Sequence, residues 1–131
     1  MNILKYITNI IINDPILVSE VNNRIYYYEA TEVDDTSDAF VVLTPILDQP
    51  SSFVSNKYLS ETYFFQVDVE SYNHQQTIDI TKRIRYLLSD ENLRQASTQL
   101  DDYFKVTQRY VMSLRYKGIP KNQYYNGERV E

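Results

Sequence analysis

The chain has 131 residues, no Cys, only two Gly, 13 Tyr and a formal net charge of −5. This length predicts one domain with a single hydrophobic core, and the acidic balance argues against a protein that holds nucleic acid mainly through a basic patch. The lack of Cys excludes disulfides and thiolate metal sites and suits a reducing cytoplasm.

Residues 2–13 predict an amphipathic helix, because isoleucines recur there at the spacing of one helical stripe: Ile3, Ile7, Ile10 and Ile11. Polar residues break this apolar run, so we expect neither a secretory signal nor a membrane span, and a soluble, intracellular protein. Asp14 followed by Pro15 is a typical N-cap and first-turn pair, which predicts a second short helix over PILVSEV.

The next segments predict two strands and two loops. RIYYYEA (24–30) is rich in strand-forming residues, and AFVVLTPI (39–46) is a nearly continuous apolar strand that a proline disturbs at its end. Between them, TEVDDTSD (31–38) crowds acidic residues into a loop. Residues 47–59 mix Pro, Ser, Asn and aromatics, so we expect a long loop that is functional or mobile.

Residues 61–71 alternate as a half-buried strand does. One face carries Tyr63, Phe65, Val67 and Val69, which require a core. The opposite face carries Phe64, Gln66, Asp68 and Glu70, and alternation alone does not say whether it meets solvent, a ligand or another protein.

The C-terminal half predicts a long helix from His74 to about residue 88 and two strands over 93–103 and 105–118, joined by a turn at Asp101 and Asp102. The fold class is therefore α+β, with a largely antiparallel sheet of four to five strands, one long helix and an N-terminal helical segment packed on it. We expect a single domain over residues 1–117 and a flexible C-terminal arm over 118–131.

The sequence offers little catalytic machinery. His74 is the only histidine and is expected in the first turn or cap of the long helix, and neither a nucleophile motif nor a glycine-rich phosphate loop is present. Asp68 and Glu70 could hold Mg²⁺ in a nuclease, but Ser71 and Tyr72 follow where such sites usually place a lysine. We predict no enzyme, cofactor or metal, and keep a metal-dependent nuclease and a single-strand nucleic-acid binder as alternatives.

The order of these segments resembles a family of phage proteins. NNRIYYYEATEVDDTSDAFVVLTPILDQP, SETYFFQVDVES, HQQTIDITKRIRYLLSD and VMSLRYKG follow an N-terminal amphipathic helix. This pattern resembles the tail-terminator, tail-completion or head-to-tail joining proteins of long-tailed, non-contractile bacteriophages (siphoviruses).

The resemblance implies a structural virion protein that is assembled in the host cytoplasm and located at the head–tail junction. Its partners would be copies of itself in a ring, commonly of six, the tail tube protein and the head connector or head-closure protein. A head-closure role in the neck is the nearest alternative. Contacts in the family come from loops and termini, which here are residues 31–38, 47–59 and the arm from 118.

Two hypotheses assign residues to such a ring. Gln66, Asp68 and Glu70 would line a channel through which DNA passes without sequence-specific binding, although a solvated face explains the same alternation. Exposed ion pairs of about 0–1 kcal/mol each would set the register between subunits. These would join Arg83 and Arg85 of one copy to Asp34, Asp35 or Asp38 of the next.

Overall fold

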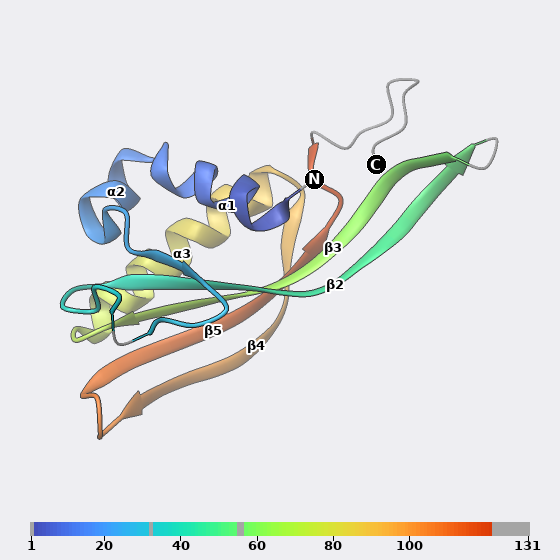
Figure 1. Cartoon of the computed structure of the whole chain (residues 1–131). Coiled ribbons are helices and arrows are strands. Elements are labelled where there is room, and N and C mark those ends of the chain that lie inside the picture. Colours follow the sequence, from blue (N-terminus) through green and yellow to red (C-terminus); the bar gives the residue numbers. More distant parts are fainter. Residues whose placement is uncertain (1, 32, 55–56, 122–131) are drawn as a thin grey trace.

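Five strands and three helices make up the part of the chain that the computed structural model describes, residues 2–31, 33–54 and 57–121. The helices cover one face of the sheet (Figure 1). In chain order the elements are α1 (Ile3–Ile12), α2 (Pro15–Val21), β1 (Ile25–Tyr27), β2 (Phe40–Val54), β3 (Lys57–Ser71), α3 (His74–Asp90), β4 (Leu93–Phe104) and β5 (Arg109–Gly118).

Each helix begins at a side chain that accepts a backbone hydrogen bond, which satisfies one of the free N–H groups of the first turn. Asn2 caps α1, Asp14 caps α2 and Asn73 caps α3. Pro15 follows its cap in the first turn, as the sequence predicts. All three predicted helices are confirmed, and His74 is the first residue of α3 rather than its cap.

The sheet has the order β1-β2-β3-β5-β4. All neighbouring strands are antiparallel except β1 and β2, which are parallel, so the predicted α+β class is confirmed. Strand β1 is shorter than the segment expected from residues 24–30, because Tyr28 takes a left-handed conformation with φ 71° and turns the chain away.

The core lies between the helices and the sheet face that bears the apolar half of β3. Val67 and Phe65 pair there with Leu114 and Tyr116 of β5. The predicted alternation of β3 is confirmed, because four side chains are at most 3% exposed: Tyr63, Phe65, Val67 and Val69. The isoleucine stripe of α1 packs on this face.

The expectation of a long loop over residues 47–59 is wrong. Strands β2 and β3 continue as a hairpin whose pairing runs to Val54 and Lys57, and in Figure 1 this hairpin extends beyond the helices. A register shift after Pro45 agrees with the predicted disturbance of the strand there, and a second shift accommodates Pro50, which lies in the segment expected to be a loop. Strand β1 pairs only with residues 41–43 of β2. The rest of β2 has no described strand on that side, so a proline whose nitrogen faces that side removes no hydrogen bond to a neighbouring strand.

The predicted turn at Asp101 and Asp102 is also wrong. Both residues lie within β4, and pairing continues to Phe104 and Arg109. The turn occupies residues 105–108, where Gln108 has φ 58° and its N–H donates to the Phe104 carbonyl at 2.7 Å. Because β4 is an edge strand, its exposed positions tolerate the turn-forming aspartates on which the prediction relied.

Strand β5 ends at Gly118, where the expected C-terminal arm begins, and residues 122–131 lie outside the described residues. A Cβ at this glycine would lie 2.0 Å from the Asn92 carbonyl oxygen, so the close approach of the two backbones requires glycine.

Candidate interaction surfaces

The predicted channel-facing residues lie together on the sheet face opposite the core. Gln66 donates a hydrogen bond of 2.9 Å from Nε2 to Asp68 Oδ1. Arg115 Nε on β5 donates to Gln66 Oε1 at 3.0 Å. Strand pairing brings Arg115 opposite Gln66. This neighbour could not be predicted from the sequence, because β3 and β5 are far apart along the chain.

Glu70 closes this row and forms a partly buried ion pair with Arg109. The Nε of Arg109 lies 3.4 Å from Glu70 Oε1, within ion-pair distance but without hydrogen-bond geometry. Burial raises the pKa of Glu70, and the attraction of Arg109 opposes this effect only in part. The Arg109 guanidinium also lies over the Phe40 ring, 5.1 Å from its centroid. The row is thus a mixed-charge network rather than a strip of acids.

The acidic loop between β1 and β2, described over residues 29–31 and 33–38, is held by its own aspartates. Asp34 accepts hydrogen bonds from the N–H and hydroxyl of Thr31 at 2.7 and 3.1 Å. Asp35 accepts two bonds from Ser37, at 3.0 Å from the N–H and 2.6 Å from the hydroxyl, and these lower the pKa of its carboxyl. Two of the three predicted interface aspartates therefore also shape the loop that presents them.

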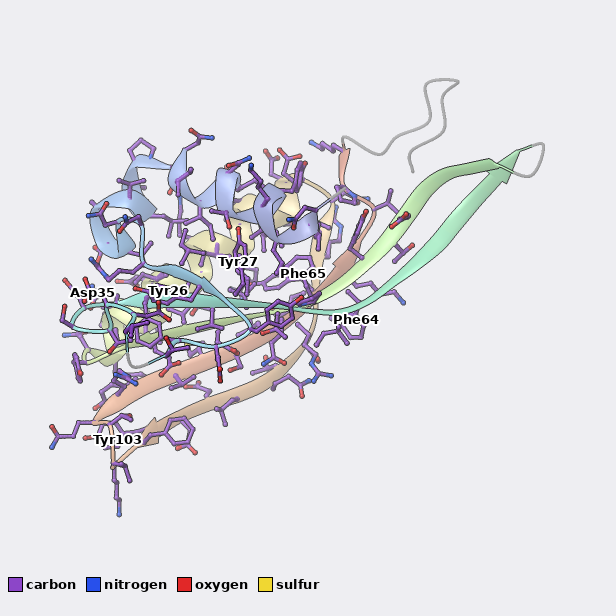
Figure 2. The ribbon with its side chains drawn as sticks, viewed as in Figure 1. Tyr26, Tyr27, Asp35, Phe64, Phe65 and Tyr103 are labelled. Atoms are coloured by element: carbon purple, nitrogen blue, oxygen red, sulfur yellow. The ribbon has the colours of Figure 1, made fainter. Side chains whose placement is uncertain are left out.

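Two contacts attach the acidic loop to the sheet. The Tyr26 hydroxyl donates to the backbone carbonyl of Asp35, and Figure 2 shows this ring beside the loop. Asp38, the third predicted interface aspartate, lies 3.8 Å from an Arg24 nitrogen and stays 64% exposed. Both contacts attach the C-terminal half of the loop, and the Asp38 carboxylate remains open to solvent or to a partner.

A tyrosine-rich hollow of about 510 Å³ lies beside the acidic loop. Its lining consists of Ile25, Tyr26, Tyr27, Tyr28, Glu29, Thr31 and Asp34. Tyr28 is 67% exposed and keeps the left-handed conformation that ends β1, which is costly for a bulky residue. The Tyr28 N–H donates to the Leu43 carbonyl at 2.9 Å, so pairing with β2 holds this conformation.

The two predicted interface arginines have different environments. Arg83 binds Asp14 of the same chain through two hydrogen bonds of 2.6 and 3.1 Å, so it ties α3 to the start of α2. Arg85 is exposed and donates to Gln95 Oε1 of β4 at 3.2 Å. The structure brings neither arginine near the aspartates of its own acidic loop, and of the pair Arg85 is the one open to a second molecule.

The aromatic rings at the far end of the β4–β5 hairpin form a ladder that the sequence did not indicate. His74 stacks on Tyr110 with ring centroids 4.9 Å apart, and Tyr110 meets Tyr103 at 4.7 Å. Antiparallel pairing places Tyr103 opposite Tyr110, and the start of α3 brings His74 onto the same face. Only the alternation of Tyr110 in its strand could have predicted part of this cluster.

Two searches of the described residues complete the survey of sites. No group of three or more His, Cys, Asp or Glu side chains in residues 2–31, 33–54 and 57–121 is placed to hold a metal ion. In the same part of the chain, no helix has the length and apolar character needed to cross a membrane.

Comparison with known proteins identifies a solved structure with a similar fold. No protein-family model and no curated protein sequence matches the chain. Among solved structures, the chain is similar to one from the virion of a native gene transfer agent (GTA) particle, with a TM-score of 0.62 and 11% sequence identity. The likeness covers 87% of this chain and 90% of that chain. At this identity the similarity establishes a shared fold.

Proposed function

We propose that the protein is a structural component of a phage-like virion, specifically a tail terminator at the head–tail junction. The observation that carries the proposal is the fold shared with a chain of a gene transfer agent virion over nearly the whole of both chains. The order of sequence segments independently resembles phage tail-terminator and joining proteins, so two different kinds of evidence favour the same class.

The distribution of surface features supports an assembly role. Large apolar side chains with 37–67% exposure occur on α2, on β1 and the residue after it, and on α3: Ile16, Val18, Tyr27, Tyr28 and Tyr86. Tyrosines combine a large apolar area with a polar tip and are enriched at protein interfaces. The β2–β3 hairpin extends beyond the helices (Figure 1) and offers a further surface for contact.

In this proposal, copies of the chain form a ring that caps the tail tube and receives the head connector, and the family resemblance implies a hexamer. The acidic loop and the β2–β3 hairpin supply contacts, and the protein carries out no catalysis. The face with Gln66, Asp68 and Glu70 turns toward the bore. Arg109 and Arg115 lie among these residues, so DNA would pass a nearly balanced row with weaker repulsion than acids alone would give.

Imaging of particles tests the proposed role. An early stop codon in the gene, introduced into the phage-like element that encodes it, should yield filled heads and separate tails of excessive, uncontrolled length. A plasmid copy of the intact gene should restore joined particles. Heads that have lost their DNA beside tails of normal length would instead assign the protein to head closure, and normal infectious particles would refute both roles.

The orientation toward the bore has its own test. Asp68→Lys should slow DNA ejection by adding positive charge beside Arg115, whereas Asp101→Lys on the exposed edge strand β4 provides the same charge change elsewhere. Equal ejection rates for both variants and the unmodified particle would refute a bore-facing position of Asp68.

A further inference from the structure

Helix α3 and strand β4 form a basic hollow of about 490 Å³. Its lining consists of Lys82, Arg85, Tyr86, Ser89, Arg94 and Gln95. All charged side chains among these lining residues are positive, although the chain as a whole carries a net charge of −5. Hydrogen bonds of 3.2 Å from Arg85 to Gln95 and 3.3 Å from Arg94 to Ser89 hold the two arginines across the hollow.

This hollow belongs to a face of α3 that no other described element covers. Ile80, Ile84 and Leu88 turn toward the core, whereas Tyr86 on the outer side is 64% exposed. The Arg83 guanidinium lies 5.3 Å from the centre of the Tyr86 ring, which keeps the ring beside the positive charges. An exposed aromatic ring among arginines is typical of a protein interface.

A surface of opposite charge lies at the other edge of the sheet. The acidic loop follows β1, and β1 and β4 are the two outermost strands of the sheet. The loop carries Glu29 and Asp38 on its exposed ends, and internal hydrogen bonds hold it in shape. The tyrosine-rich hollow next to it provides space for a side chain from a partner.

We propose that the basic hollow binds the acidic loop of a second copy of the chain. Because the two surfaces are different and lie at opposite edges, the contact is head-to-tail and can repeat around a closed ring. This inference rests on the proposed ring-forming function and identifies the surfaces that would join its subunits. It differs from the ion pairs expected from the sequence, because Arg83 is bound to Asp14 and Lys82 and Arg94 take its place beside Arg85.

Side chains, rather than added strands, make this contact. Strand β4 contains register shifts after Gln95 and Thr98, and bulges of this kind discourage pairing with a further strand. The attraction is between exposed charged side chains of the two copies. It should weaken with salt, because exposed charges are screened beyond a Debye length of about 10 Å at 0.1 M.

Charge reversal on each surface tests the proposal. One variant combines Lys82→Glu with Arg85→Glu, and a second combines Glu29→Lys with Asp38→Lys. The second keeps the hydrogen bonds of Asp34 and Asp35 and the Tyr26–Asp35 contact, and it removes the Arg24–Asp38 ion pair. A third chain carries all four changes. The control for the first variant, Lys5→Glu with Lys105→Glu, makes the same charge change at exposed positions outside the basic hollow. Circular dichroism confirms folding, and sedimentation equilibrium at low and high salt measures association.

We expect wild-type chains to associate at low salt, each double variant to associate roughly tenfold or more weakly, and the control to stay within about threefold of wild type. The chain with all four changes should recover most of the association, because its two surfaces are complementary again. Recovery is the decisive result, since a folding defect would not be repaired by further substitutions.

Four outcomes would overturn the inference. They are unchanged association in the double variants, failure of the four changes to restore it, a wild-type chain that remains monomeric at millimolar concentration, and loss of short duplex DNA binding by the Lys82/Arg85 variant with association unaffected. The last would make the hollow a phosphate site. If any of these accompanied unjoined heads and overlong tails in the stop-codon particles, the proposed function would stand without this contact.

Discussion

Substitution of Asp14 is expected to destabilise the fold, because this side chain performs two tasks at once. It caps α2 by accepting a hydrogen bond of 3.1 Å from the Leu17 N–H, and it binds the Arg83 guanidinium of α3 through bonds of 2.6 and 3.1 Å. Its side chain is only 6% exposed. The Asp14 carboxylate therefore connects the start of α2 to α3.

The expected cost of Asp14→Ala follows from these contacts. Loss of an N-cap costs about 0.5–2 kcal/mol, and loss of a hydrogen bond to a charged group about 1.5–3 kcal/mol. Because the Arg83 side chain stays 31% exposed, water screens the ion pair, and we expect its contribution to lie at the lower end of the range for a charged hydrogen bond. We expect the free energy of unfolding to fall by about 2–4 kcal/mol. Asp14→Asn keeps a competent cap and should cost about half as much.

Urea unfolding of both variants at neutral pH measures these differences. The pKa of Asp14 is lowered in the folded protein, mainly by its hydrogen bond to Arg83. Its stabilising effect is therefore complete above the unfolded-state value of about 3.9 and is lost as the pH falls through the lower folded pKa. The difference in the free energy of unfolding between wild type and Asp14→Asn should become smaller over that acidic range.

Two results would refute this reasoning. Equal losses for the Asn and Ala variants would show that the cap contributes nothing, and additive losses in a double-mutant cycle with Arg83→Ala would show that the two side chains do not interact. Chemical denaturation of the single and double variants decides both points.

Three further predictions concern Tyr116, Gly118 and Glu70. Tyr116→Phe should leave the free energy of unfolding unchanged or slightly higher in urea titrations, because its buried hydroxyl has no hydrogen-bond partner among the described residues; a clear loss of stability would contradict this. Gly118→Ala should lower that free energy by about 1–3 kcal/mol, since the new Cβ would meet the Asn92 carbonyl oxygen, and thermal melts that match wild type would refute the close approach. Burial raises the pKa of Glu70, so ionisation opposes folding, and wild type should gain stability relative to Glu70→Gln as the pH falls through that raised pKa. A difference that does not vary with pH would contradict the last prediction.

Local signals in the sequence were sufficient for the helices and for the central strand. Asp14 followed by Pro15 specifies a helix start through contacts within four residues, and the period-two pattern of residues 61–71 specifies which side chains are buried. These features depend on neighbours in the chain and on the amount of apolar surface to be covered. The α+β class follows from their order.

Long-range pairing decided what the sequence predicted incorrectly. Pro50 and the aspartates at 101 and 102 have local preferences for loops and turns, yet bulges and an exposed edge accommodate them within strands. The strand register that overrides these preferences is set by residues far away in the chain.

The same distinction applies to the candidate surfaces. The sequence by itself determined that Gln66, Asp68 and Glu70 share one face and that the loop at 31–38 is acidic, because both depend on adjacent residues. Only the tertiary structure decided that Arg109 and Arg115 balance the acids of that face, that Arg83 is bound internally and that Arg94 joins Lys82 and Arg85 in a basic hollow. Ionic partners are chosen by distance in space, and that distance is set by how the sheet and helices pack.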